Sequence, residues 1–365
     1  MQWEEGGNQA VVKNNKKFDI YDGSNMHLDK TNKVRARTIS QALKDLIIKS
    51  ENVYIMGHKN SDLDCVGGAL GVYKIAKAYG KNAKIILDVK HNTSTKTVIE
   101  RLTEDADYEG VFITREDCKK LDTENALLVV VDTHKESYLA VPDIFEEFDK
   151  VVVIDHHRRG PEFIANAILT YHEVYASSTA ELVTELLMYL DEVKLTAKEA
   201  EAIFSGILID TKNFTFKTGV RTFEVAAYLK KMGVDMTEIK QLFQNDFETY
   251  MARVNIVKNA EIIDGQIAIS CTNEQIKDIS VIAAQAADEL LAISGILASF
   301  VLCELEGVIM ISGRSLGDIN VQIILERLGG GGHLTFAGAQ LAGVSLDEAR
   351  QKLLEEIKEY FSKTE

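Results

Sequence analysis

The sequence predicts an α/β protein in which a parallel-sheet domain is joined by a helical linker to a smaller α/β domain. Two observations indicate this fold class. Apolar runs of strand length alternate with helical patterns over residues 53–208, as is typical of a parallel sheet. From residue 262 onward a second series begins, with a short strand, a helix, a hairpin pattern and two further helices.

The individual elements follow from these patterns in chain order. Residues 1–35 are expected to be irregular apart from a short strand at 10–12, and a helix is predicted at 38–48. The first domain is predicted to contain strands 53–56, 84–87, 111–113, 127–131 and 151–154 and helices 66–79, 95–102, 178–190 and 199–208. The second is predicted to contain strands 266–270, 299–305 and 307–312 and helices 275–291, 320–328 and 346–361.

The domain boundaries are placed where these series start and stop. Residues 1–35 are expected to precede the first domain, which covers 36–246 and ends in helices broken near Gly233. A helical linker is predicted at 247–261, followed by the second domain at 262–365.

Composition limits the classes of protein to be considered. The 365 residues, 46% of them hydrophobic, suffice for large cores, and no apolar run approaches the ~20 residues that span a bilayer. The four cysteines are scattered without a CxxC pair, so we expect reduced thiols in a cytosolic protein. The formal net charge of -15 argues against long nucleic acid as the main partner, but it is compatible with a small anionic ligand and divalent metals.

Histidines and aspartates gather where the predicted strands end. They are His58, Asp62 and Asp64 after the first strand, Asp132 after the fourth, Asp155, His156 and His157 after the fifth, and Asp210 after helix 199–208. The carboxyl ends of parallel strands form the usual ligand-binding edge of an open α/β sheet. The pattern therefore favours a metal site over the alternative, a solvated loop in which Asp62 or Asp64 caps the next helix.

Two further motifs are candidates for binding an anionic ligand. Ser178 opens helix 178–190 with Glu181 three residues later, which is a capping-box pattern, and the same helix start can also hold phosphate. Four glycines at 329–332 precede His333, and they permit close approach of the backbone to a ligand. A phosphate or base contact is favoured there over a plain flexible turn.

These motifs resemble, in order, those of the DHH phosphoesterase family with its DHH-associated C-terminal domain, over about residues 36–365. Asp155-His156-His157 is the namesake motif, and His58-x-x-x-Asp62-x-Asp64, Asp132 and Asp210 match the others. The Gly-Gly-Gly-His stretch and Arg314-Ser315 resemble the associated domain. Within the family, segments such as 175–183 are similar to the cyclic-di-AMP phosphodiesterases of the GdpP type.

The resemblance implies a site for two metal ions. His58 and Asp62 would bind one ion, Asp64, His156 and Asp210 the other, and Asp132 would bridge them. An imidazole and carboxylate set without thiolate suits two Mn²⁺ ions, with other divalent metals as alternatives. The resemblance also implies roles for further residues: catalysis for Asp132, Asp155 and His157, and substrate binding for Arg158, Ser178, Arg314, Ser315, Gly330, Gly331, Gly332 and His333. For His157 the alternative is that it orients His156 or only packs.

The implied activity is hydrolysis of cyclic-di-AMP to the linear dinucleotide 5′-pApA, with cyclic-di-GMP as a poorer substrate. Other DHH activities stay open, namely a linear oligonucleotide or pApA phosphodiesterase and a pyrophosphatase, as does a non-catalytic nucleotide-sensing module. The expected partner is the cyclic dinucleotide. We expect this segment to contact neither long nucleic acid nor a membrane, and we expect it to form a homodimer. Residues 5–13 resemble the last strand of a degenerate GGDEF domain. The chain is therefore expected to be the cytoplasmic portion of a longer, membrane-anchored bacterial protein.

Overall fold

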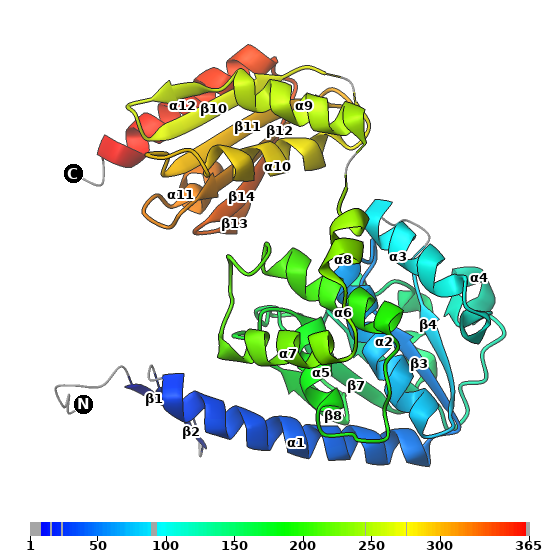
Figure 1. Cartoon of the computed structure of the whole chain (residues 1–365). Coiled ribbons are helices and arrows are strands. Elements are labelled where there is room, and N and C mark those ends of the chain that lie inside the picture. Colours follow the sequence, from blue (N-terminus) through cyan, green and yellow to red (C-terminus); the bar gives the residue numbers. More distant parts are fainter. Residues whose placement is uncertain are drawn as a thin grey trace. The chain divides into compact units, whose positions relative to one another are not determined.

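The structure is a computed structural model that describes residues 9–14, 17–22, 25–88, 93–244, 246–274 and 276–362, with side chains from residue 33 onward. The chain divides into two compact units, with the boundary between Phe243 and Gln244. Each unit contains a six-stranded sheet with helices packed on it (Figure 1). Both units are therefore of the α/β class that the alternating pattern predicts.

The sheet of the first unit is parallel throughout, in the order β5-β4-β3-β6-β7-β8. Its strands are β3 (Asn52–Met56), β4 (Asn82–Ile86), β5 (Phe112–Ile113), β6 (Leu127–Val131), β7 (Val151–Asp155) and β8 (Leu169–His172). The chain builds outward from β3 to β5 and then returns to place β6 on the other side of β3. Such a reversal leaves a crevice at the carboxyl ends of the two central strands, where α/β sheets bind ligands.

Both faces of this sheet are covered, which explains why its strands are uniformly apolar. In β6, Leu127 and Val129 pack into a large core on the helical face, whereas Leu128 and Val130 pack into a smaller core on the opposite face. All five residues of β6 are buried. Successive side chains of a strand point to opposite faces of the sheet. Because both faces are buried, every position of β6 needs an apolar residue.

The helices of the first unit gather mainly on one face, where α2, α5 and α6 pack together (Figure 1). The unit's helices are α1 (Asn25–Lys49), α2 (Leu63–Ala78), α3 (Thr93–Thr103), α4 (Arg115–Cys118), α5 (Thr179–Leu187), α6 (Ala197–Asp210), α7 (Val220–Lys231) and α8 (Met236–Leu242). The contact of α2 with both α5 and α6 matters for function, because all three carry candidate site residues at or next to their ends.

The second unit has a mixed sheet in the order β13-β14-β12-β11-β10-β9. Its strands are β9 (Glu261–Ile263), β10 (Ile267–Thr272), β11 (Ala298–Leu305), β12 (Val308–Ser315), β13 (Gly331–His333) and β14 (Phe336–Ala342). Helices α9 (Phe247–Lys258) and α10 (Ile279–Leu290) share a core on one face, and α11 (Val321–Glu326) and α12 (Leu346–Ser362) share one on the other. Among the described strands of this second sheet, β10 and β11 pair in parallel and the other neighbours pair antiparallel.

The structure differs from the predictions in three places. The strand predicted at 10–12 lies within β1 (Gln9–Asn14), but the rest of the described start is not irregular, because β1 and β2 (Lys17–Asp22) form a hairpin and α1 begins at Asn25. No glycine or proline interrupts residues 25–49, so the helix continues upstream of its apolar periodicity. Strands β8, β9, β13 and β14 were not predicted. The predicted linker lies mostly in α9, whose Ala252 and Ile256 belong to the core of the second unit.

None of the helices in the described part of the chain is long and apolar enough to cross a membrane.

Candidate metal centre

The candidate metal residues converge at the carboxyl edge of the first unit's sheet. Strand β6 lies between β3 and β7, so the loops after these three strands are neighbours. They carry His58, Asp132 and His156 respectively, and α6 delivers Asp210 as its last residue. The strand order therefore brings together residues that are far apart in the sequence.

The first potential metal-binding group consists of His58, Asp62 and Asp132. Nε2 of His58 lies 3.3 Å from Oδ2 of Asp132 and 3.7 Å from Oδ1 of Asp62. The other ring nitrogen, Nδ1, bonds the backbone carbonyl of Lys59 at 2.7 Å. A carbonyl only accepts, so Nδ1 carries a proton, and Nε2 is the nitrogen that could bind a cation placed between it and the carboxylates. Burial opposes the charged form of His58, but the hydrogen bonds to Asp132 and Asp62 outweigh burial and raise its pKa to about 12, so without a cation Nε2 is protonated as well.

The second group consists of Asp64, His156 and Asp210. Nε2 of His156 lies 3.2 Å from Oδ2 of Asp210 and 3.7 Å from Oδ2 of Asp64. The same nitrogen lies 3.6 Å from Oδ1 of Asp132, whereas His58 faces Oδ2 of that residue. One carboxylate thus presents one oxygen to each group, which is the geometry of a bridging ligand.

The residues present fit bound divalent cations. His156 is 4% exposed, and among the described residues neither of its ring nitrogens has a hydrogen-bond partner. Leaving a buried polar group unpaired costs about 1–3 kcal/mol. A cation held by Nε2 of His156 and by the surrounding carboxylates would satisfy this group and offset their mutual repulsion.

The pKa values of the buried acids also indicate a site that suits divalent cations. Burial and the charge of Asp210 raise the pKa of Asp64 to about 7, and burial and the charge of Asp62 raise the pKa of Asp210 to about 7. Burial and the charge of Asp64 also raise the pKa of Asp132 well above its ordinary value. Burial lowers the pKa of His156, which keeps its imidazole neutral and able to ligate. These shifts indicate an excess of negative charge in a buried space.

The start of α5 holds the carboxylates in position. The backbone N–H groups of Thr179 and Ala180 donate to the two oxygens of Asp64, at 2.7 and 2.8 Å. The hydroxyl of Thr179 also donates to Oδ1 of Asp132 at 3.1 Å. Asp132 itself has φ +61°, a conformation that is uncommon outside glycine and is often found at functional sites.

The position of Asp62 agrees with both interpretations of its motif, as a helix cap and as a candidate metal ligand. Its carboxylate accepts from the backbone N–H groups of Asp64 and Cys65, both at 3.0 Å, and so caps α2. The same Oδ1 faces His58. The capping alternative and the candidate ligand position are therefore compatible with one another.

Asp155 and His157 lie beside the metal-binding groups. Oδ1 of Asp155 accepts from Nδ1 of His157 at 2.8 Å and from its backbone N–H at 3.2 Å. Burial opposes the charged form of Asp155, but bonds from His134 and His157 outweigh burial and lower its pKa. The rings of His156 and His157 also contact each other, with centroids 4.5 Å apart.

Sequence reasoning missed three residues of this region, His134, His172 and Thr179. Nδ1 of His134 contacts Oδ2 of Asp155, and Nε2 of His172 donates to the backbone carbonyl of His157 at 2.6 Å. His134 was detectable, since it follows Asp132 at the same strand end. His172 ends β8, which was not predicted. No sequence pattern marked Thr179 as a site residue, because its contacts depend on how α5 packs.

The remaining candidates of the first unit have different surroundings. Ser178 is fully buried, and its hydroxyl accepts from the backbone N–H of Glu181 at 3.0 Å. Ser178 therefore caps α5, as the capping-box pattern predicts, and its predicted contact with the substrate stays a prediction. Arg158 is exposed on the loop after His157.

The other predicted substrate-binding residues lie in the second unit. Nε of Arg314 donates to Oδ1 of Asp288 at 3.1 Å, and the hydroxyl of Ser315 donates to the carbonyl of Leu334 at 3.2 Å. Gly331, Gly332 and His333 form the edge strand β13. Added Cβ atoms at Gly330 and Gly332 would lie 2.2 and 2.4 Å from the carbonyl oxygens of Gly338 and Phe336. These two glycines therefore have a structural requirement whether or not a ligand binds.

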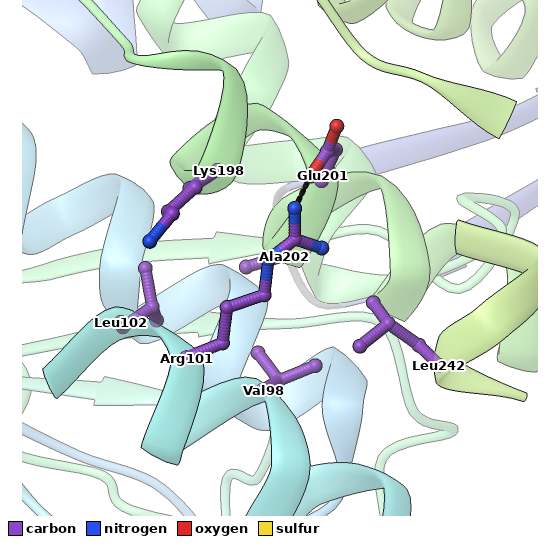
Figure 2. A pocket seen from close by; sticks show the side chains of 7 residues that line it. All are labelled: Val98, Arg101, Leu102, Lys198, Glu201, Ala202 and Leu242. Atoms are coloured by element: carbon purple, nitrogen blue, oxygen red, sulfur yellow. Dashed lines mark ion pairs between the residues drawn. The ribbon is translucent and has the colours of Figure 1, made fainter. Parts of the chain in front are cut away.

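A small cavity elsewhere in the first unit does not involve the site. Figure 2 shows its lining, in which Arg101 pairs with Glu201 among apolar side chains of α3, α6 and α8. Its volume is about 10 Å³, room for about one water molecule. None of the candidate site residues lines it.

Comparison with known proteins places the chain in a family. The sequence model of the DHH family, N-terminal domain, matches residues 52–207, and that of the DHHA1 domain matches residues 264–363. The chain is 45% identical over 360 residues to the cyclic-di-AMP phosphodiesterase GdpP of Geobacillus thermodenitrificans. The aligned region covers 98% of this chain and 55% of that protein. The chain thus spans about half the length of that relative.

Two further matches extend over nearly whole proteins. The bifunctional oligoribonuclease and PAP phosphatase NrnA of Thermus thermophilus is 30% identical over 332 residues, covering 89% of this chain and 94% of that protein. The structure of an exopolyphosphatase-related protein from Bacteroides fragilis superposes with a TM-score of 0.74 at 19% identity, over 89% of this chain and 96% of that one. Given these matches and the two domain models, the chain belongs to the DHH family and carries a DHHA1 domain after its DHH domain.

Proposed function

We propose that this chain is a metal-dependent phosphodiesterase that hydrolyses cyclic-di-AMP to the linear dinucleotide 5′-pApA. The observation that carries the proposal is the pair of potential metal-binding groups between which Asp132 lies, with one oxygen facing His58 and the other facing His156. Two cations joined by one carboxylate suit in-line displacement at phosphorus. The choice of substrate is supported by the 45% identical relative that is named a cyclic-di-AMP phosphodiesterase.

We propose Mn²⁺ as the metal, because the ligand set combines imidazoles and carboxylates without a thiolate. His58 and Asp62 would hold one ion, and Asp132 would contact both. Asp64, His156 and Asp210 would hold the second. When bound, the two ions supply Lewis-acid activation of water and of the phosphate oxygens.

The chain's own residues would orient the substrate. Nδ1 of His157 is held by Asp155, so Nε2 is the ring atom left to meet the scissile phosphate. Burial opposes the charged form of His157, but the bond to Asp155 outweighs burial and raises its pKa, which favours the cation that a phosphate would attract. Arg158, exposed on the same loop, would add a second positive charge.

Nucleotide binding is proposed for the second unit as well. Arg314 presents a guanidinium group suited to phosphate, and the exposed strand β13 offers backbone groups of Gly331, Gly332 and His333. We expect Ser315 to contribute indirectly, because its hydroxyl is bonded to the backbone of Leu334.

A second candidate function is hydrolysis of linear oligonucleotides or of pApA. It is favoured by the relative named as an oligoribonuclease, which this chain matches over 94% of that protein's length. The net charge of -15 weighs against a long single strand as the substrate, because such strands are held by positively charged grooves. A short linear dinucleotide stays compatible with the site.

The test is to identify products over time with Mn²⁺ present. Cyclic-di-AMP, cyclic-di-GMP, pApA and pyrophosphate would be supplied separately in excess, and products followed by mass spectrometry. We expect pApA to accumulate from cyclic-di-AMP, with slow further hydrolysis and a poorer reaction with cyclic-di-GMP. If AMP forms without accumulation of pApA, the linear-dinucleotide activity is the correct one.

Two variants test the site itself. Asp132→Asn removes the charge of the shared carboxylate, and His156→Ala removes a buried ligand. We expect both to lose nearly all turnover while circular dichroism stays that of the wild type. Mn²⁺-dependent activity retained in both folded variants would rule out the assigned site.

A further inference from the structure

His134 is a buried histidine beside the site to which the proposed reaction gives no role. It lies on the loop after β6, two residues beyond Asp132, and is 6% exposed. Both of its ring nitrogens are engaged. Nε2 is 3.3 Å from the backbone nitrogen of Gly160, and Nδ1 contacts Oδ2 of Asp155. Because the N–H of Gly160 donates, Nε2 accepts, and Nδ1 therefore carries the proton that is donated to Asp155.

Asp155 connects His134 to the last histidine of the DHH motif. Its side chain is fully buried, and each of its oxygens has a histidine partner. Oδ2 receives Nδ1–H of His134, whereas Oδ1 receives Nδ1–H of His157 at 2.8 Å. The three side chains therefore form one chain of hydrogen bonds centred on a carboxylate.

This chain of bonds determines which atom of His157 is available. Its Nδ1 is held by Asp155, whereas 54% of its side chain is exposed. The ring thus turns Nε2 away from Asp155. If His134 lost its donor, Oδ2 of Asp155 would remain buried with one hydrogen-bond partner fewer. Because an unpaired buried oxygen is unfavourable, rotation of the carboxylate toward another donor would then be favoured.

A metal ion is the alternative explanation for this cluster, since ligand atoms of His134, Asp155 and His172 lie close enough together to hold one. The hydrogen bonds argue against it. Both ring nitrogens of His134 are already engaged, and Nε2 of His172 donates to the carbonyl of His157 at 2.6 Å. The cluster is satisfied without an ion, in contrast to His156.

We propose that His134 is a positioning residue: through Asp155 it fixes the orientation of the His157 ring, and so the placement of Nε2 toward the substrate phosphate. The proposal rests on the proposed function for its substrate, but the hydrogen-bonded chain exists in the free protein. It can therefore be tested without turnover.

The test compares two substitutions at one position. His134→Phe keeps the ring volume but removes the donor, whereas the amide nitrogen of His134→Asn lies near the place of Nδ1 and restores a donor. For His134→Phe we expect kcat to fall about 10–100-fold, the usual effect of losing a group that orients a site residue, with KM little changed. His134→Asn should recover most of the lost kcat. Calorimetric titration with Mn²⁺ should give wild-type affinity for both.

A spectroscopic measurement separates this proposal from the proposed function. ¹H–¹⁵N spectra of histidine-labelled protein without substrate should show a hydrogen-bonded, slowly exchanging Nδ1–H of His157 in the wild type and in His134→Asn. In the His134→Phe variant this Nδ1–H should exchange rapidly with water, so that its signal is weakened or lost. A wild type without activity on cyclic-di-AMP would defeat the proposed function, whereas the spectra would still decide the role of His134.

The matched control is Thr133→Val. Thr133 is the neighbouring buried residue, and its hydroxyl accepts from the backbone N–H of Lys135 at 3.2 Å. We expect wild-type kcat and a wild-type Nδ1–H signal of His157 in this variant. The proposal is overturned if His134→Phe leaves the Nδ1–H signal of His157 unchanged, or if His134→Asn and Thr133→Val lose as much kcat as His134→Phe.

Discussion

The hydroxyl of Thr179 donates a 3.1 Å hydrogen bond to Oδ1 of Asp132, a residue 47 positions earlier in the chain. The backbone N–H of the same threonine donates to Asp64 at 2.7 Å. Thr179 therefore touches the carboxylate shared by both metal-binding groups and a carboxylate of the second group. Its position at the first turn of α5 also directs the positive end of the helix dipole toward these acids.

Replacing Thr179 by valine should weaken metal binding. The substitution preserves the shape of the side chain and the backbone bond to Asp64, but it frees Asp132 to rotate. We expect the affinity for Mn²⁺ to fall about 10–100-fold, as is typical when a partner of a ligating carboxylate is lost. Isothermal titration calorimetry measures the change. Thr179→Ser keeps the hydroxyl and should bind within a few-fold of wild type, and equal affinities in all three proteins would contradict the prediction.

Addition of Mn²⁺ should raise the melting temperature of the first unit. Burial and like charges raise the pKa values of Asp64 and Asp210 to about 7, so the metal-free site is electrostatically unfavourable. A ligand at one hundred times its dissociation constant contributes about 2.7 kcal/mol. For a domain of this size that corresponds to a shift of roughly 5–10 °C. Differential scanning calorimetry with and without a chelator tests this, and Asp132→Asn should show a much smaller shift.

Arg314→Ala should weaken substrate binding more than it slows chemistry. The guanidinium donates to Asp288 at 3.1 Å and to the carbonyl of Gly313 at 2.9 Å, which orients it on β12. We expect KM for cyclic-di-AMP to rise at least several-fold while kcat changes little. Arg314→Lys should recover only part of the binding, because an ammonium group lacks the planar fork.

The control for Arg314 is Asp288→Asn, which keeps the guanidinium but weakens its ion pair. Its effect on KM should be smaller than that of Arg314→Ala. If Arg314→Ala instead lowers kcat with KM unchanged, Arg314 is not a substrate-binding residue.

Arg221 should be important for stability rather than for catalysis. Its Nε and Nη2 donate to the two oxygens of Glu185, at 2.7 and 2.5 Å, and Nη2 also meets the hydroxyl of Tyr171 at 3.3 Å. This buried network joins α7, α5 and β8. Arg221→Met would leave the charge of Glu185 buried without its partner, and we expect the free energy of unfolding to fall by about 3–5 kcal/mol in urea titrations.

The matching double variant separates charge from packing. Replacing Glu185 as well, in Arg221→Met/Glu185→Met, removes the unpaired charge and should recover a large part of the lost stability. A double variant as unstable as Arg221→Met would show that packing, and not the ion pair, determines the loss.

The strands of the first unit were predictable because parallel strands are covered on both faces. The runs 127–131 and 151–154 are apolar at every position, and they coincide with β6 and β7 to within one residue. The polar residues that follow them interrupt the apolar pattern at the carboxyl edge of the sheet, and so they marked the functional edge. By contrast, β13 consists of two glycines and a histidine and has no strand pattern, since its partner strand β14 supplies the pairing.

The sequence by itself determined the α/β class, the alternation that makes the first sheet parallel, and the set of acids and histidines at its strand ends. Those properties are local, because they depend on periodicity and on where an apolar run stops. Only the tertiary structure decided that β3 and β6 are neighbours, and that Asp132 therefore presents one oxygen to His58 and the other to His156. The same holds for His134 and Thr179, whose partners Asp155 and Asp64 lie 21 and 115 residues away. Strand order and helix packing are set by the burial of a whole core, and no single segment of the sequence encodes them.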